Sequence, residues 1–549
     1  MRRAFLARAF TRIKMKTHRT LVIILLTLAC ATLAHAKNIE PRFSRREAPV
    51  LTLAQNNTAL EIRLNNEHPC TVEKIAINLD GTTDLNDIAS VRIHYAGRDK
   101  KSHPFGETRA PVAGEMVFAG SQAAGVPPGV FKISIRLKPS ADLLNRINVS
   151  CAWMQIDGKR IAGAAMPAPG LRVGVAVRQA GDDGVARFRI PGIVTTPKGT
   201  LLAIYDVRRE KSRDLQGDID IGLSRSTDGG QNWEPMRIVL DMGEWGGLPQ
   251  RYNGVSDACI LVDDRTGDVY VAGLWMHGLL DAEGRWIEGL SENSTEWTHQ
   301  WRAKSSQPGF GVKQTSQFLL AKSTDDGRTW SPPKNLTRAL KKEEWWLFAP
   351  APGRGIMLKD GTLVMPAQGR DEKGLAFSNI VLSRDAGKTW SASHPAYSGS
   401  NENQIVQLDD GSIMLNSRRG RDQGSRAVTV THDLGKTWRE HPSSGALVEP
   451  GCMAALHRHE YAAPDGSRKS ILLFANPNSK KAREKMTIKV SFDNGATWPA
   501  RHWILLNEEK RSAYSCLTSV DEQTIGILYE AGAANMVFQK IPLAEILNR

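Results

Sequence analysis

The sequence is poor in cysteine and contains no Cys-x-x-Cys pair. Six cysteines occur among 549 residues, and Cys30 lies in an apolar N-terminal stretch. Structural zinc sites and small disulfide-stabilised domains need closely spaced cysteines, so the sequence argues against both. A single bridge between Cys70 and Cys151 remains open, because an exported protein can form disulfides.

Signatures of nucleic-acid binding are also absent. The formal net charge is +14, but about half of that excess comes from the first 19 residues. The rest of the chain contains no zinc-finger, helix-turn-helix or aromatic RNA-binding motif. Its modest basic excess suits an anionic substrate. We therefore expect no nucleic-acid partner.

The apolar run LVIILLTLACATLA follows a basic stretch that ends at Arg19 and precedes the small-x-small sequence Ala-His-Ala. This order is typical of a secretory signal peptide, and the run is short for a membrane span. We predict a signal peptide over residues 1–36 and a mature chain from Lys37 with no transmembrane segment. The mature protein is then secreted, to a periplasmic, cell-surface or extracellular location. An uncleaved anchor and a lipoprotein at Cys30 are the alternatives.

What the second half of the chain does contain is a repeated motif, Ser/Thr-x-Asp-x-Gly-x-x-Trp. It occurs five times, at 226–233, 323–330, 383–390, 431–438 and 491–498. Asp and Gly favour a tight turn, and the Trp offers an apolar surface to a core. Alternating β-prone segments flank the copies, so each turn belongs to a small sheet. A small sheet that recurs along the chain predicts a β-propeller.

Residues 37–170 lack this repeat. They show short alternating segments, such as ALEIRLNN and FKISIRLKP, separated by Gly, Pro and Asn. The pattern predicts a separate β-sandwich. The segment AGAAMPAPG is the best linker candidate, and the propeller is expected to span 171–549.

The string Arg-Phe-Arg-Ile-Pro at 187–191 opens what we expect to be the first propeller strand. Its last four residues form the motif FRIP, and the five copies of the repeated motif that follow are Asp boxes. Together they resemble the bacterial exo-sialidase (neuraminidase) family. The resemblance implies an all-β fold with a six-bladed β-propeller, here preceded by a jelly-roll-like β-sandwich. Five blades with the motif and one without it would complete the six.

Members of this family bind the carboxylate of sialic acid with three arginines, because guanidinium groups donate paired charge-assisted hydrogen bonds. By resemblance these are Arg189 in the FRIP motif, Arg418 at the end of SIMLNSR and Arg483 before EKMTIKV. Arg419 is the rival of Arg418, which we prefer because it continues the strand register. Glu530 in GILYEAG matches the carboxylate that orients the first arginine.

The resemblance also implies a tyrosine nucleophile, Tyr514 in RSAYSCLT. Sialic acid carries a carboxylate on its anomeric carbon, so a neutral phenol approaches without the repulsion that a carboxylate nucleophile would meet. Sialidases are a known exception to the two-carboxylate scheme of glycosidases. A phenol has a reference pKa of about 10 and needs a base. Glu402 in SNENQIVQLDDG matches the base of the family.

The general acid and base is expected on the loop after LLAIYDVRR. Asp214 is our choice, because it follows Arg208 by six residues, as in family members where that Arg and that Asp face the substrate. Asp206, Asp218 and Asp220 are the alternatives.

Asp257 in NGVSDACILV matches the Asp that accepts a hydrogen bond from the N-acetyl amide, with turn capping as its alternative. Together these residues predict a retaining exo-α-sialidase that hydrolyses terminal sialic acid from glycoproteins, glycolipids and oligosaccharides through a covalent sialyl-tyrosine intermediate, without metal ion or cofactor. The alternatives are a catalytically silent sialoglycan-binding propeller and a trans-sialidase or intramolecular trans-sialidase. Transfer would depend on aromatic groups near the leaving group, for which Trp275, Trp297 and Trp301 are candidates.

Overall fold

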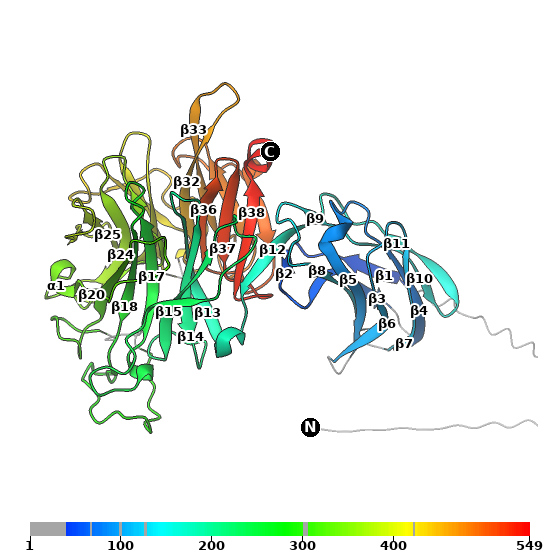
Figure 1. Cartoon of the computed structure of the whole chain (residues 1–549), viewed down its shortest axis with the longest axis horizontal. Coiled ribbons are helices and arrows are strands. Elements are labelled where there is room, and N and C mark those ends of the chain that lie inside the picture. Colours follow the sequence, from blue (N-terminus) through cyan, green and yellow to red (C-terminus); the bar gives the residue numbers. More distant parts are fainter. Residues whose placement is uncertain (1–39, 66–68, 98–100, 126–128, 300–305, 421–422) are drawn as a thin grey trace, which may run out of the picture.

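The computed structural model describes residues 40–65, 69–97, 101–125, 129–299, 306–420 and 423–549. The predicted signal peptide lies outside these residues. Two parts built almost entirely of β-strands lie beside each other, the smaller formed by the N-terminal residues and the larger by the rest (Figure 1). The all-β fold class is therefore confirmed.

The N-terminal part is a sandwich of two antiparallel sheets. One sheet has the order β1 (Glu40–Ser44), β3 (Asn57–Asn65), β8 (Val130–Leu137), β5 (Ile88–Ala96) and β6 (Ser102–Arg109). The other has the order β11 (Lys159–Ala164), β10 (Ser150–Ile156), β4 (Cys70–Asn78) and β7 (Met116–Ala124). Buried side chains alternate along β5 with more exposed ones, as expected for strands that cover a core on one face.

The bridge left open between Cys70 and Cys151 does not form, although both side chains are buried. The antiparallel register of β4 and β10 places Cys151 opposite Ile77, at the far end of β4 from Cys70. Since a strand rises by about 3.3 Å per residue, the two cysteines are separated by roughly 20 Å. A disulfide needs Cα atoms within about 7 Å.

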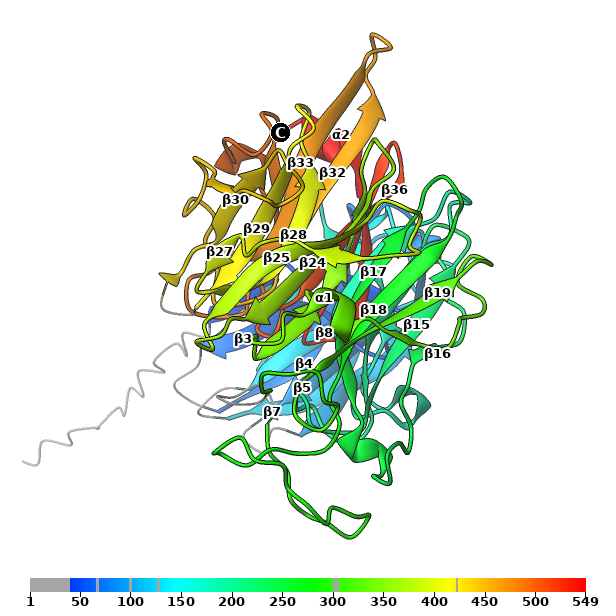
Figure 2. The ribbon, with the colours of Figure 1, turned by 90° about the vertical axis from the view of Figure 1, so that its left-hand side faces the viewer.

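Among the described residues, six further sheets form the propeller. The first contains β13 (Arg187–Thr195), β14 (Leu201–Arg208), β15 (Ile219–Ser226) and β16 (Arg237–Leu240). The second contains β17 (Val255–Val262), β18 (Val269–Trp275), β19 (Gln317–Ser323), β20 (Lys334–Asn335) and β22 (Gly353–Arg354). The third contains β21 (Leu347–Pro350), β23 (Ile356–Met357), β24 (Leu363–Arg370), β25 (Ala376–Ser383), β26 (Ser391–Ala392) and β27 (Tyr397–Ser398). Figure 2 shows that the third sheet, with β24 and β25, lies beside the fourth, which begins with β28.

The fourth contains β28 (Ser400–Gln407), β29 (Ile413–Arg419), β30 (Ala427–Thr431) and β31 (Arg439–Glu440). The fifth contains β32 (Ala455–Ala462), β33 (Arg468–Pro477), β34 (Met486–Ser491) and β35 (Ile504–Asn507). The sixth contains β36 (Ser515–Asp521), β37 (Thr524–Tyr529), β38 (Met536–Pro542), β12 (Leu171–Arg178) and β2 (Val50–Thr52). The short strand β9 (Arg146–Ile147) also pairs with β12. Two short helices, α1 (Thr337–Leu340) and α2 (Leu543–Leu547), lie outside the sheets.

The ring closes through a strand from the N-terminal side of the propeller. β12 pairs with β38, so the sixth blade combines the two ends of the propeller sequence. β2, which lies within the stretch predicted as the N-terminal domain, pairs with the other edge of β12. The expectation that the strand with the FRIP motif comes first is therefore wrong. β12 precedes it and completes the last blade, which is the blade without an Asp box.

Each Asp box joins the third and fourth strands of its blade, as between β34 and β35. There Asp493 Oδ1 accepts hydrogen bonds from Ser491 Oγ at 2.6 Å and from the backbone N–H of Thr497 at 2.9 Å, while Oδ2 accepts one from Thr497 Oγ1 at 2.6 Å. The Trp of this box, Trp498, packs against the core between two blades. The repeats therefore build turns at the edge of the scaffold.

Replacing Asp493 by Ala is expected to lower the midpoint of thermal unfolding, because three hydrogen bonds of the turn are lost at once. We expect a decrease on the order of 2 °C, as for a small local loss in a large protein. Asp465→Ala is the matched control. Asp465 accepts similar bonds from Ser467, but its hairpin, between β32 and β33, projects beyond the blades (Figure 1). Equal midpoints for the Asp493 variant and the wild type would contradict this account.

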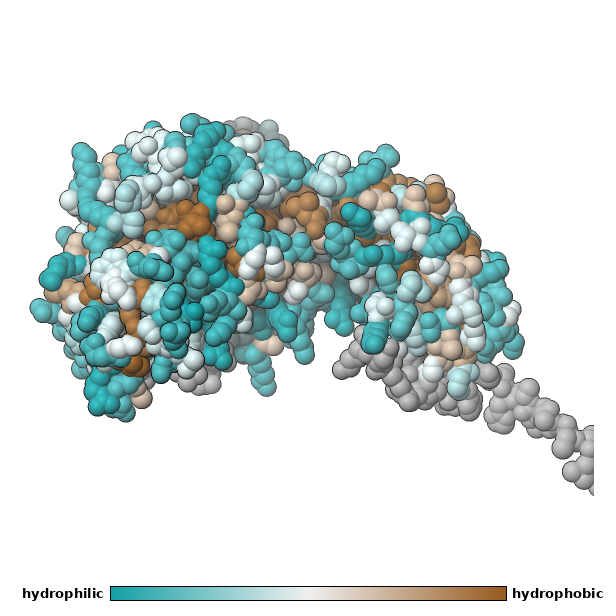
Figure 3. Space-filling model, turned by 60° about the horizontal axis from the view of Figure 1, so that its bottom comes forward, coloured by the Kyte–Doolittle hydropathy of each residue, from teal (hydrophilic) through white to brown (hydrophobic). Residues whose placement is uncertain are grey.

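Apolar side chains are concentrated between the sheets. Polar side chains cover most of the face shown in Figure 3, and apolar ones appear there in separate patches. Among the described residues, no helix has both the length and the apolar character needed to span a membrane.

Candidate active site

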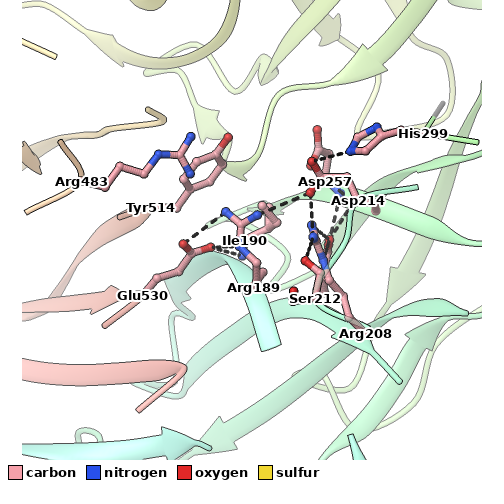
Figure 4. Close-up of polar contacts among 12 residues, drawn as sticks. Arg189, Ile190, Arg208, Ser212, Asp214, Asp257, His299, Arg483, Tyr514 and Glu530 are labelled. Carbon is pink, nitrogen blue, oxygen red and sulfur yellow. Dashed lines mark hydrogen bonds and ion pairs between the residues drawn. The ribbon is translucent and has the colours of Figure 1, made fainter. Parts of the chain in front are cut away.

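The candidate residues gather at one end of the central axis of the propeller, where the innermost strands of several blades begin. Arg189 lies in β13, Asp257 in β17 and Glu402 in β28, and Tyr514 immediately precedes β36. The pairing of each of those three strands with its neighbour shifts register at or beside the named residue. Such β-bulges re-aim side chains, and Figure 4 shows Arg189 and Asp257 within one site.

Tyr514 is held between a base and a cation. Its Oη donates to Glu402 Oε1 at 2.5 Å and accepts from Arg418 Nη1 at 2.8 Å. Arg418 Nη1 also donates to Glu402 Oε2 at 2.5 Å, so the two charged groups are paired beside the phenol. The tyrosine is 5% exposed and the glutamate 6% exposed, which leaves water little access to either.

The phenol of Tyr514 is neutral in this environment. Burial and the negative charge of Glu402 raise the pKa of Tyr514 well above its usual value, against the opposing effect of Arg418 and Arg483. A proton on Oη therefore leaves only if a base already in contact accepts it. Glu402 Oε1 has that position.

Arg189 is fixed by Glu530. Arg189 Nε donates to Glu530 Oε1 at 3.1 Å and Nη2 donates to Oε2 at 3.3 Å. The backbone N–H of Ile190 adds a bond of 2.9 Å to Oε1, for which Ile190 adopts a φ of 63°. This left-handed conformation is strained for a β-branched residue. This conformation of Ile190 lets the side chain of Arg189 and the backbone N–H of Ile190 both donate to the buried carboxylate of Glu530.

The guanidinium groups of Arg418 and Arg483, like that of Arg189, lie beside Tyr514. The guanidinium carbons of Arg189 and Arg483 each lie 5.3 Å from the ring centroid of Tyr514, and Arg418 contacts its hydroxyl. Arg483 donates to the carbonyl of Gly451 at 3.1 Å. Within the described part of the chain no acidic side chain forms an ion pair with Arg483. This arrangement can bind a carboxylate by charge-assisted hydrogen bonds.

Asp214 lies on the loop between β14 and β15. Its Oδ1 accepts from Arg208 Nη1 at 2.7 Å and from Arg189 Nη1 at 3.4 Å, and its Oδ2 lies 3.4 Å from His299 Nε2. Burial alone would raise the pKa of Asp214, but the hydrogen bond from His299 and the charges of Arg208 and Arg189 hold it well below its usual range. With 38% of its side chain exposed, Asp214 is the accessible carboxylate of the site.

Arg208 lies behind Asp214. It is 1% exposed, and its Nε and Nη2 donate to Asp206 Oδ2 at 3.2 and 2.9 Å. Its Nη1 donates to Asp214 and to the carbonyl of Ser212. Because these bonds use most of its donors, Arg208 supports the Asp214 loop. The substrate contact of Arg208 stays a prediction.

Asp257 is buried beside other acids. Burial, together with the negative charges of Glu402, Asp206 and Asp214, raises the pKa of Asp257 well above its usual value. These surroundings favour the protonated form of Asp257, in which one oxygen accepts a hydrogen bond and the O–H donates one. Gln368 Nε2 lies 3.4 Å from its Oδ2.

The structure also separates the alternatives. Arg419 Nη2 donates to Tyr397 Oη at 2.8 Å, away from Tyr514. Asp218 and Asp220 both lie near Arg209, with Asp220 Oδ2 at 2.7 Å from its Nη2. Asp206 has no exposed surface and holds Arg208. Of these carboxylates, Asp214 alone combines exposure with contact to the arginine of the FRIP motif.

His299 was not among the residues predicted for the site. It lies in the irregular stretch 276–299 that follows β18, which extends below the blades in Figures 1 and 2 and gives no periodic signal. Trp297, from the same segment, donates through Nε1 to the carbonyl of Gln216 and so attaches this segment to the Asp214 loop. Trp275 is 2% exposed and belongs to the core, while Trp301 lies outside the described residues.

Comparisons of the sequence point to one family. The family described as "BNR repeat-like domain" matches residues 199–527, and the "N-terminal domain of BNR-repeat neuraminidase" matches residues 38–116. A sialidase of Bacteroides fragilis (strain YCH46) is 40% identical over 530 residues, which cover 91% of this chain and 94% of the relative. A sialidase of Micromonospora viridifaciens is 32% identical over 387 residues, which cover 68% of this chain and 54% of that one.

Solved structures agree. The Hadza microbial sialidase Hz136 has a TM-score of 0.82 and 36% identity, and the match covers 92% of this chain and 100% of the other. A Trypanosoma rangeli sialidase, solved with 2,3-difluorosialic acid, has a TM-score of 0.50 and 21% identity, and the match covers 66% of this chain and 55% of the other. That second likeness shows the fold alone.

A propeller whose central site combines three arginines, a buried tyrosine and several carboxylates defines a glycoside hydrolase for an acidic sugar. With the relatives above, the assignment becomes specific: the chain belongs to the BNR-repeat neuraminidase family and is an exo-sialidase.

Proposed function

We propose that this exo-sialidase is a retaining hydrolase that forms a covalent intermediate between sialic acid and Tyr514. The observation that carries the proposal is the contact of Tyr514 Oη with Glu402 Oε1 at 2.5 Å and with Arg418 Nη1 at 2.8 Å. Its substrates are terminal α-linked sialic acids of glycoproteins, glycolipids and oligosaccharides.

The carboxylate of the substrate would bind among Arg189, Arg418 and Arg483. Two of these groups flank the ring of Tyr514 and the third contacts its hydroxyl. A carboxylate held there brings the anomeric carbon, to which it is bonded, next to Oη. The buried ion pair with Glu530 keeps Arg189 in place before the substrate arrives, which reduces the entropy lost on binding.

The first step is the attack of Tyr514 on the anomeric carbon. The Oη–H proton moves to Glu402 Oε1, an Oη lone pair forms the new C–O bond, and the bond to the leaving oxygen breaks with its electron pair. Arg418 stabilises the negative charge that develops on Oη. Asp214 donates a proton to the leaving oxygen, so the aglycone departs as an alcohol. In the second step Asp214 removes a proton from water, whose oxygen forms a bond to the same carbon. The bond from that carbon to Tyr514 Oη breaks with its electron pair, and Oη regains its proton from Glu402.

Two further residues would orient the substrate and the acid. An acceptor oxygen of Asp257 fits the amide N–H of the N-acetyl group. Arg208 fixes Oδ1 of Asp214 from behind. Asp214 is ionised in the free enzyme, because its pKa lies well below the usual range. It must therefore gain a proton before it can act as an acid.

Incubation with α2,3- and α2,6-sialyllactose, followed by proton NMR, tests the proposal. We expect the α-anomer of free sialic acid to appear first and to convert to the β-anomer only by mutarotation. Immediate release of the β-anomer would exclude a retaining mechanism. A sialic acid transferred to another sugar as the first product would indicate a trans-sialidase instead of a hydrolase. An anhydro sugar as the first product would indicate an intramolecular trans-sialidase.

We also propose that the protein is exported and that its mature chain consists of a sandwich over 37–170 and a propeller over 171–549. The basic and apolar N-terminal pattern with its small-x-small site supports export. N-terminal sequencing of the secreted protein is expected to begin at Lys37. Retention of the full-length chain in the cytoplasm would contradict the proposal.

A further inference from the structure

The two oxygens of Asp214 have different surroundings. Oδ1 lies against two guanidinium groups, Arg208 Nη1 at 2.7 Å and Arg189 Nη1 at 3.4 Å. Guanidinium groups only donate hydrogen bonds. A proton on Oδ1 would therefore point toward donors that cannot accept it, so an acidic proton on Asp214 belongs on Oδ2.

His299 is the neighbour of Oδ2 among the described residues. Its Nε2 lies 3.4 Å from that oxygen, and Figure 4 shows its ring pointing toward the carboxylate. The ring also packs edge-on against Trp297, with 5.6 Å between centroids. Trp297 is bonded to the carbonyl of Gln216 and lies under Arg213, whose guanidinium carbon is 4.3 Å from its centroid. The histidine is therefore attached to the same loop that carries Asp214.

We propose that His299 provides the proton that Asp214 gives to the glycosidic oxygen. An imidazolium at His299 transfers its Nε2 proton to Oδ2. The N–H bond breaks, an O–H bond forms, and a neutral imidazole remains. When Asp214 later takes a proton from the attacking water, the proton returns from Oδ2 to Nε2. The balance closes over one turnover, and no other reactant is needed. This inference rests on the proposed role of Asp214.

In this arrangement Asp214 delivers the proton, while His299 holds it between turnovers. An imidazolium with a carboxylate and a neutral imidazole with a carboxylic acid hold the same number of protons. Activity therefore follows the protonation of the pair. Without the imidazole, only the carboxyl group of Asp214 would hold this proton, and its pKa lies well below the usual range. The charged or titratable groups around the pair are Arg189 of β13, Asp206 and Arg208 of β14, Asp257 of β17 and Arg213 of the shared loop.

His299→Gln in the full-length enzyme tests the inference, because Gln keeps an N–H donor but cannot carry an acidic proton. Hydrolysis of sialyllactose, whose leaving group needs a proton, is expected to fall by about 100-fold at pH 7. The alkaline limb of kcat/KM should move to lower pH. Hydrolysis of a 4-methylumbelliferyl sialoside, whose leaving group departs as a stabilised phenolate, should stay within a few-fold of the wild-type rate. His432→Gln is the control, because His432 is an exposed histidine in the fourth Asp box. It should change the rate of hydrolysis of neither substrate.

A pH profile of His299→Gln that matches the wild type would overturn the inference, and so would an equal loss on both substrates. The aryl substrate thus also reports whether the site is still folded. Asp214→Ala tests the proposed function separately, since its kcat/KM, which reports the step in which the leaving group departs, should show the same discrimination between leaving groups. If Asp214→Ala discriminates and His299→Gln does not, the inference on His299 fails alone. If Asp214→Ala leaves both rates unchanged, the proposed role of Asp214 fails and the inference falls with it.

Discussion

Tyr514→Phe is expected to lower kcat on sialyllactose on the order of 10³-fold or more, while sialic acid still binds. Phenylalanine keeps the ring between the guanidinium groups of Arg189 and Arg483 but removes the oxygen that would bond to the anomeric carbon. Glu402 and Arg418 remain paired with each other at 2.5 Å. No buried charge is therefore left without a partner, and the variant should fold.

Tyr270→Phe is the matched control for the Tyr514 variant. Tyr270 is a buried tyrosine of β18 whose hydroxyl donates to the carbonyl of Ala386 at 3.0 Å, outside the site. Its loss should cost about 1 kcal/mol of stability and leave kcat unchanged. Treatment with 2,3-difluorosialic acid, followed by peptide mass spectrometry, should place an adduct on Tyr514 in the wild type and in Tyr270→Phe, and none on the Tyr514→Phe variant. Normal turnover by Tyr514→Phe would rule out the covalent mechanism.

The scaffold was predictable because its signals are local. Each Asp box specifies a turn through side-chain oxygens and backbone groups four residues apart, as at Asp493 and Thr497. Such contacts are readable from one sequence, so five of the blades could be expected. The closure by β12 could not, because β12 and β38 pair across most of the chain and β12 carries no motif. The FRIP strand was taken as the first for that reason.

The site residues were found by resemblance, and their geometry shows why pattern alone would have failed. Asp257 and Glu402 lie inside register shifts, where alternation no longer tells which way a side chain points. Asp257 moreover adopts a φ of 55°, which a strand pattern does not anticipate. Three-dimensional pairing is needed to see such bulges.

Two electrostatic roles were likewise hidden from the sequence. Arg208 supports Asp214 from a buried pair with Asp206, which lies two residues earlier on the same side of β14. His299 comes from an irregular segment more than 80 residues beyond Asp214, and only tertiary contact brings them together. A histidine near two tryptophans in a polar stretch was the available cue, and it is too common to indicate a role by itself.

Arg189→Lys is expected to weaken the binding of sialic acid roughly 10- to 150-fold. Lysine keeps the positive charge but cannot donate two parallel bonds to a carboxylate, and one lost charge-assisted hydrogen bond costs about 1.5–3 kcal/mol. Lysine is a cleaner replacement than alanine. The side chain of Glu530 is 4% exposed, and a buried carboxylate without a cation would cost about 3–5 kcal/mol of stability.

Titration calorimetry with sialic acid measures this loss directly, and KM for sialyllactose should rise in parallel. Arg225→Lys is the matched control, because Arg225 is a buried arginine of β15 that pairs with Asp326 and Glu234 away from the site. It should lower the unfolding midpoint without changing the affinity for sialic acid. If Arg189→Lys bound sialic acid as tightly as the wild type, the substrate carboxylate could not depend on the FRIP arginine. Binding by Arg418 and Arg483 alone would then have to explain the affinity, and the strained φ of Ile190, which aligns Arg189 on Glu530, would serve the scaffold instead of the substrate.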